Sequence, residues 1–176
     1  MITESWPWRR SLRAKVSQIN KVQSYTRLRR DTIALLEHDI LVAFFEVRKL
    51  IDARTKIPRS VADKNIPVLV YPSIKAFGNW QRFDLHDHFD LSKPSSHSLT
   101  VQKLSNQFIH LLVFSFAFDE LNRLRGVYVV SDFDRGKKCH LVSLDAVKDT
   151  LLLVANSEAK SFQIGLADGL DLISND

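Results

Sequence analysis

Residues 111–143 read LLVFSFAFDELNRLRGVYVVSDFDRGKKCHLVS, and this stretch decides the fold class. Three runs rich in β-branched and aromatic residues, at 111–118, 125–131 and 138–143, are typical of β-strands. The short polar segments DELN and DRGK separate these runs and have the composition of turns. Because both connections are short, the three runs predict an antiparallel meander.

Upstream of the meander, apolar residues recur at helical spacing in residues 6–25 and again in residues 31–51. Ser5 and Asp31 are suited to cap the two helices, and Pro58 follows the second one. The second helix is apolar around most of its circumference, which predicts a central position in the fold.

Residues 99–109 and 145–154 predict two further helices, and residues 67–71 predict a strand that precedes the meander. We therefore expect an α+β fold, in which an N-terminal helical hairpin packs on a small C-terminal antiparallel sheet of three to four strands with a short C-terminal helix. One domain is expected over residues 1–176. Its parts are the helical hairpin (1–57), a strand and a long loop (58–98), a helix with the meander and the last helix (99–155), and a weakly structured tail (156–176).

The composition excludes several classes of protein. The longest mainly apolar run, residues 108–118, is shorter than the roughly 20 residues that a membrane span needs. The five glycines are too scattered for a phosphate-binding loop, and the single cysteine, Cys139, rules out multi-thiolate zinc sites. One cysteine and no visible signal peptide predict a cytoplasmic location.

The net charge of +5 is concentrated at the N-terminus. Residues 1–30 carry eight basic side chains and one acidic one, whereas the remaining residues carry 17 basic and 19 acidic side chains. This asymmetry indicates a polyanionic partner, with Trp6 and Trp8 available to stack on unpaired bases. The predicted phosphate contacts are Arg9, Arg10, Arg13, Lys15, Lys21, Arg27, Arg29 and Arg30. A solvated helix face, or a face paired with the acidic tail, is the alternative interpretation.

A second cluster lies in residues 84–90, which read DLHDHFD within a long aperiodic segment, residues 72–96. If these residues are extended, alternate side chains share one face. Imidazole and carboxylate groups suit a divalent metal such as zinc, iron or manganese. The predicted ligands are Asp84, His86, His88 and Asp90, and an ordinary polar surface loop is the alternative.

A third cluster surrounds the start of the meander. Asn106 and His110 lie one helical turn apart, immediately before an apolar strand, and Asp132 follows the neighbouring strand. These three residues are the candidate catalytic group, with His110 as a base that Asp132 orients. A partly buried histidine that fixes the helix to the sheet is the structural alternative.

The segments AFFEVRKLI (43–51), NQFIH (106–110) and VSD (130–132) together resemble a group of small bacterial proteins of uncharacterised function. The resemblance extends over most of residues 43–132. It implies a bacterial or mobile-element origin and a cytoplasmic location, and it implies no activity.

These observations lead to three hypotheses. The first is a non-catalytic binding or accessory protein that contacts nucleic acid, or an acidic protein partner, through the basic N-terminal helix. The second is a small hydrolase of nucleic acid or nucleotides that depends on a divalent metal or on the His110–Asp132 pair. The third is an inhibitor or structural subunit that docks on another protein, as a homo-oligomer or within a larger complex.

Overall fold

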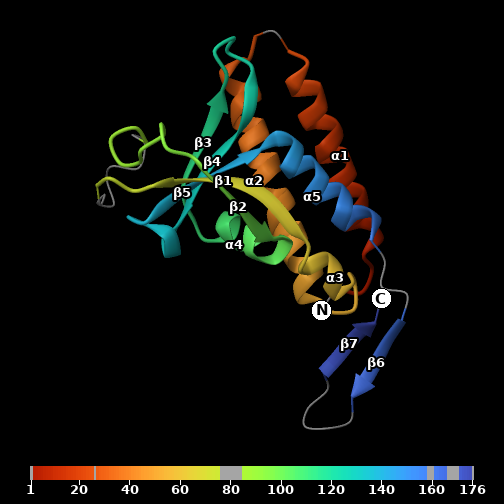
Figure 1. Ribbon diagram of the computed structural model, residues 1–176. Coiled ribbons are helices and arrows are strands. Elements are labelled where there is room, and N and C mark those ends of the chain that lie inside the picture. The colour runs from red at the N-terminus through yellow and green to blue at the C-terminus, as the bar shows by residue number, and fades with distance from the viewer. Residues whose placement is uncertain (1, 26, 76–84, 158–160, 166–170, 176) are drawn as a thin grey trace.

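The computed structural model describes residues 2–25, 27–75 and 85–157, and the backbone of residues 161–165 and 171–175 (Figure 1). The helices are α1 (Trp6–Gln23), α2 (Arg30–Asp52), α3 (Arg59–Ala62), α4 (Val101–Ile109) and α5 (Leu144–Asn156). The strands are β1 (Asn65–Pro72), β2 (Ser95–Thr100), β3 (Leu111–Phe118), β4 (Leu124–Ser131), β5 (Lys138–Ser143), β6 (Ser161–Gly165) and β7 (Asp171–Asn175).

The α+β class and the helical hairpin are confirmed, but the main sheet has five strands rather than three or four. Its order is β2-β1-β5-β4-β3, and every neighbouring pair is antiparallel. The missed strand is β2, whose sequence SSHSLT lacks the apolar alternation of a strand with one buried face. β2 lies at an edge of the sheet and is largely exposed, so its polar composition has a physical reason.

Apolar side chains cover both faces of the sheet. On one face, Val68, Val127 and Val142 belong to a large core that the helices complete. On the other face, Val130 and Cys139 lie in a smaller core with side chains of residues 85–91, including Leu85 and Phe89. Part of the segment expected as a loop therefore covers the second face of the sheet.

α4 links the two edges of the sheet, because β2 precedes it and β3 follows it. The Thr100 side chain accepts a hydrogen bond from the Lys103 N–H and caps this helix. Phe108 of α4 stacks on Phe44 of α2, with ring centroids 3.8 Å apart. This contact holds the centre of α2 against the helix that crosses the sheet.

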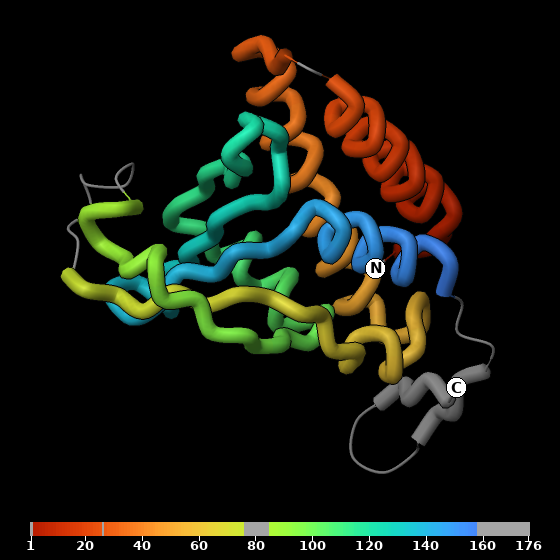
Figure 2. The backbone as a smooth tube through the Cα atoms, turned by 45° about the horizontal axis from the view of Figure 1, so that its top comes forward, coloured from red at the N-terminus to blue at the C-terminus, as the bar shows by residue number. Residues whose placement is uncertain are grey.

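α1 is the outermost helix and packs against α2 and α5 (Figure 2). Its inner stripe, which consists of Leu12, Val16, Ile19 and Val22, is buried, as the helical spacing predicts. The outer side of α2 differs from the expectation of a wholly central helix, since Leu35 is 63% exposed and Phe45 is 46% exposed.

Arg9 extends the inner stripe of α1 with a buried charge. The Arg9 guanidinium donates hydrogen bonds to the carbonyls of Val154 (2.9 Å), Ala155 (3.5 Å) and Lys56 (2.5 Å). Two of these carbonyls lie in the last turn of α5, where the helix itself leaves C=O groups unpaired. Arg9 therefore joins the start of α1 to the end of α5 and to the segment after α2.

The tail expected to be weakly structured contains a two-stranded antiparallel hairpin, β6–β7. Within the described residues, no helix combines the length and apolar composition that crossing a bilayer requires.

We predict that Arg9→Met destabilises the fold by about 2–3 kcal/mol, because it removes the charged hydrogen bonds from a buried guanidinium to three backbone carbonyls. Urea denaturation measures this loss. Arg10→Met is the matched control, since Arg10 is exposed on the same helix and its replacement leaves the free energy of unfolding nearly unchanged. Equal stability of the two variants would contradict this role of Arg9.

Candidate functional site

The structure divides the eight predicted phosphate contacts into two groups. Arg9, Arg13 and Lys15 interact with the protein itself. Arg9 is only 5% exposed, so it is not available as a surface phosphate contact. Arg13 donates hydrogen bonds to the Ala155 carbonyl (2.7 Å) and the Asn156 side chain (3.1 Å), both at the end of α5.

Lys15 lies between α1 and α2. Its Nζ is 3.1 Å from Oε1 of Glu46, and the same oxygen accepts a hydrogen bond of 2.8 Å from the Ser11 hydroxyl. Both charged side chains are nearly buried, with 13% and 11% exposure. Lys15 is therefore neutralised by a carboxylate of the protein and contributes little to the external field.

The other five basic residues are exposed and form no ion pair with a described carboxylate. They are Arg10, Lys21, Arg27, Arg29 and Arg30. Arg10 and Lys21 are eleven residues apart, which brings them to the same side of α1 at a separation of about 16 Å along its axis. Exposed positive charges therefore lie along the outer face of α1, from Arg10 to the turn between α1 and α2.

Positive charge is concentrated in and beside the α1–α2 turn, residues 24–29. Residues 20–31 hold four basic side chains and one acidic side chain, Asp31. Arg29 occupies the N-cap position of α2 without making a side-chain capping hydrogen bond. The first N–H groups of α2 add the positive end of a helix dipole to the same place.

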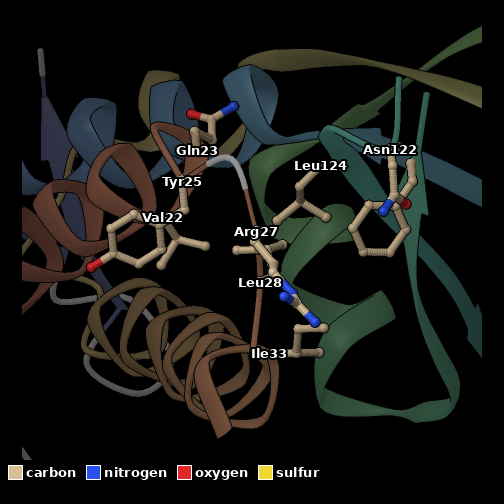
Figure 3. Close-up of a pocket in the computed structure, with 9 residues that line it drawn as sticks. Val22, Gln23, Tyr25, Arg27, Leu28, Ile33, Asn122 and Leu124 are labelled. Atoms are coloured by element: carbon tan, nitrogen blue, oxygen red, sulfur yellow. The ribbon is translucent and has the colours of Figure 1, made fainter. Parts of the chain in front are cut away.

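A hollow of about 300 Å³ lies between the α1–α2 turn and the β3–β4 hairpin. It is lined by Val22, Gln23, Tyr25, Arg27, Leu28, Ile33, Phe118, Asn122 and Leu124. In Figure 3, Tyr25 and Val22 enter from the helical side and Asn122 and Leu124 enter from the hairpin, with Arg27 between them. Tyr25 and Phe118 are each 42% exposed, so both rings are accessible from solvent.

Asp119 fixes the shape of the hairpin beside this hollow. Its Oδ1 accepts hydrogen bonds from the N–H groups of Leu121 and Arg123, and Asn122 adopts a left-handed conformation, with φ of 57°. Its Oδ2 accepts from the guanidinium Nε of Arg123 (2.9 Å) and of Arg125 (3.0 Å). The hydrogen bond from the Arg123 backbone, with smaller contributions from the two guanidinium groups, lowers the pKa of Asp119.

The expected metal cluster does not form in the way that an extended segment predicts. Residues 85–89 form a turn, in which the His88 and Phe89 N–H groups donate to the Leu85 carbonyl. His86 is exposed, whereas His88 is 3% exposed and its Nδ1 lies 3.2 Å from the Lys75 carbonyl. These two histidines therefore do not share one face.

The other two predicted ligands are Asp84 and Asp90. Asp84 lies outside the described residues. Asp90 is paired with Ser92 and Lys93, and the hydrogen bond from the Ser92 side chain is the largest cause of the lowered pKa of Asp90. Within the described part of the chain, no three His, Cys, Asp or Glu side chains are grouped as metal ligands.

The candidate catalytic group is also separated. The Asp132 N–H donates to the His110 carbonyl at 2.8 Å, so the two residues meet through the backbone. The His110 ring lies edge-on to Phe133, with centroids 4.8 Å apart, and Asn106 accepts a hydrogen bond from Arg48. No hydrogen bond joins the side chains of His110 and Asp132 among these contacts.

A different histidine–aspartate pair is present. The buried Nε2–H of His140 donates to Oδ2 of Asp134 at 3.0 Å, and the His140 side chain is 1% exposed. The His140 side chain lies on the helix side of the sheet. Its cross-strand neighbours are Val70 of β1 and Val129 of β4. The sequence signal was a histidine inside an apolar strand, six residues after an aspartate.

Burial lowers the pKa of His140. The Asp134 carboxylate opposes this shift, and the electrostatic influence of Lys138 and His97 adds to it. Nδ1 of His140 is buried without a hydrogen-bond partner among the described groups, so a second proton would be placed on a nitrogen with no acceptor. The pair is closed to solvent, which indicates a structural role.

Comparison of this chain with models of protein families, with curated proteins and with solved structures finds no match.

We predict that the stability of the protein falls as the pH drops below about 6.5, the ordinary pKa of histidine. Because the folded-state pKa of His140 is lowered, the unfolded chain binds a proton at a higher pH than the folded chain does. Thermal unfolding between about pH 7.5 and about pH 5 measures this effect. His140→Gln keeps a donor for Asp134 and removes the titration, so its unfolding temperature falls less steeply. Parallel profiles would contradict this linkage.

Proposed function

We propose that this protein is a non-catalytic binding protein that contacts single-stranded nucleic acid through the α1–α2 turn and the outer face of α1. The observation that carries the proposal is the group of five exposed basic side chains that pair with no carboxylate in the described part of the chain, of which Arg27 lines the hollow. Because no carboxylate among the described side chains pairs with them, we infer that their field extends into solvent.

The charged group offers contacts to phosphates rather than to base edges. Arginine and lysine neutralise phosphates and release counterions, which makes binding strong at low salt and independent of sequence. The exposed N-terminus of α2 adds backbone N–H groups that favour an anion at the same place.

The rings of Tyr25 and Phe118 favour an unpaired strand over a duplex or an acidic peptide. Both rings border a hollow that also contains the Arg27 guanidinium. Aromatic rings beside a positively charged groove are the usual platform for stacking unpaired bases. An acidic peptide would use the charges but would gain little from the rings.

The proposal does not extend to catalysis. Neither the His86–His88 turn nor the His110–Asp132 pair brings reactive side chains together in one cleft, and the His140–Asp134 pair is closed to solvent.

We predict that replacing Arg27, Arg29 and Arg30 with glutamine weakens binding to a single-stranded oligonucleotide by at least about tenfold at low salt. Each lost phosphate contact also reduces the salt dependence of log K by about 0.7. Fluorescence anisotropy at several salt concentrations measures both quantities.

The matched control for this experiment replaces Arg59, Lys64 and Lys103 with glutamine. It changes the net charge equally, and it alters exposed residues near the opposite end of α2, about 34 Å away along that helix. Similar affinities for the two triple variants, or binding of the native protein that does not depend on salt, would refute the proposal.

A second prediction concerns the aromatic rings. Tyr25→Ala and Phe118→Ala should each weaken binding to single-stranded DNA or RNA by roughly tenfold, since one stacked base contributes about 1–3 kcal/mol. The salt dependence should remain that of the native protein. Leu121→Ala is the control, because Leu121 is exposed on the same hairpin but carries no ring. If polyglutamate binds as tightly as the oligonucleotide, and both alanine variants bind normally, the ligand is an acidic protein instead.

A further inference from the structure

The two edges of the five-stranded sheet differ in chemistry. The β2 edge is formed by Ser95–Thr100, which is polar and largely exposed. The β3 edge is formed by Leu111–Phe118, with the sequence LLVFSFAF, which contains no charged residue and no proline. Charges, prolines and polar residues are the means by which sheets prevent edge strands from pairing with other chains. β3 has neither a charge nor a proline, and Ser115 is its single polar side chain.

The backbone of β3 is paired on one side only. Its hydrogen-bonded partner is β4, and no described residue pairs with its other side. β-bulges between Leu111 and Val113 and between Ala117 and Phe118 leave residues 113–117 as a regular segment. Every second residue of this extended segment therefore presents its N–H and C=O groups outward, while the others face β4.

We propose that β3 pairs antiparallel with β3 of a second copy of this chain, so that the two sheets become one continuous sheet. A two-fold axis through Ser115 is the register that the sequence favours, because Phe114 of one copy then lies opposite Phe116 of the other. These rings already make an edge-to-face contact within one chain, with centroids 5.1 Å apart, and both are only partly buried. Pairing places four phenylalanines in one cluster, and aromatic cross-strand pairs stabilise antiparallel sheets.

The charges at the ends of β3 also fit this register. His110 and Glu120 lie just beyond the two ends of β3, so an antiparallel pair brings His110 of one copy to the same end as Glu120 of the other. Both side chains are exposed, and neither forms an ion pair with a described residue. Each end of the pair therefore carries His110 of one copy and Glu120 of the other rather than two like charges.

The same register separates the two proposed nucleic-acid sites. Phe118, which borders the hollow, lies three residues from the axis in each copy. The two hollows then lie at opposite ends of the β3 pair, about 20 Å apart along the strands. The proposed dimer depends only on pairing of β3, so its test does not depend on whether the protein binds nucleic acid.

Sedimentation equilibrium over a roughly hundredfold range of protein concentration tests the dimer. The native chain should shift from monomer to dimer as the concentration rises. Ser115→Lys introduces an edge charge at the two-fold axis and should remain monomeric. Ser96→Lys is the matched control, since Ser96 is exposed on the opposite edge, and this variant should dimerise normally. Circular dichroism confirms that both variants are folded.

Cross-linking tests the register. In the paired state Ser115 faces its own counterpart at a Cα separation of about 4.5–5.5 Å, which a disulfide can span. Ser115→Cys should therefore oxidise to a covalent dimer, whereas Ser96→Cys should not. The native Cys139 does not interfere, because it is fully buried and burial raises its pKa to about 12.

Several results would overturn the proposal. They are a native chain that remains monomeric at every concentration, a Ser115→Lys variant that dimerises as well as the Ser96→Lys variant, and cross-linking that is equally fast at positions 96 and 115. If capture experiments show a different protein on β3 while the native chain remains monomeric, the edge belongs to that partner.

Discussion

The docking of α1 on α2 and α5 is the constraint on which the candidate site depends. The apolar stripe from Leu12 to Val22 is buried, and Arg9 binds carbonyls at the end of α5 and after α2. With the inner face of α1 fixed in this way, Arg10 and Lys21 point away from the protein. The same docking holds the α1–α2 turn beside the β3–β4 hairpin, where the hollow forms.

Segments with strong periodicity could be predicted from the sequence. β3 and β5 have the predicted bounds, and α2 and α4 differ from the predictions by one or two residues. The helices bury one apolar stripe, and the two strands carry apolar residues on both faces of the sheet, so apolar composition and spacing report their conformation. β2 could not be found in this way, because a largely exposed edge strand imposes no apolar pattern on its sequence. Backbone pairing with β1 forms that strand instead.

The candidate sites were harder to predict, because the sequence around a polar residue does not show in which direction its side chain points. The sequence identified the excess of positive charge but could not show that Arg9 is buried or that Lys15 pairs with Glu46, 31 residues later in the chain. It proposed His110 with Asp132, whereas the pair that forms is His140 with Asp134. The contribution of Phe118 to the hollow also depends on tertiary packing and left no local pattern.

The central claim is that the exposed basic side chains around the α1–α2 turn form a surface for single-stranded nucleic acid. Mapping amide chemical-shift changes during titration with a short oligonucleotide tests this claim most directly. We expect the changes to cluster in residues 21–33 and 118–124, and to disappear at high salt. Changes confined to the α3 end, or no changes at low salt, would contradict the account.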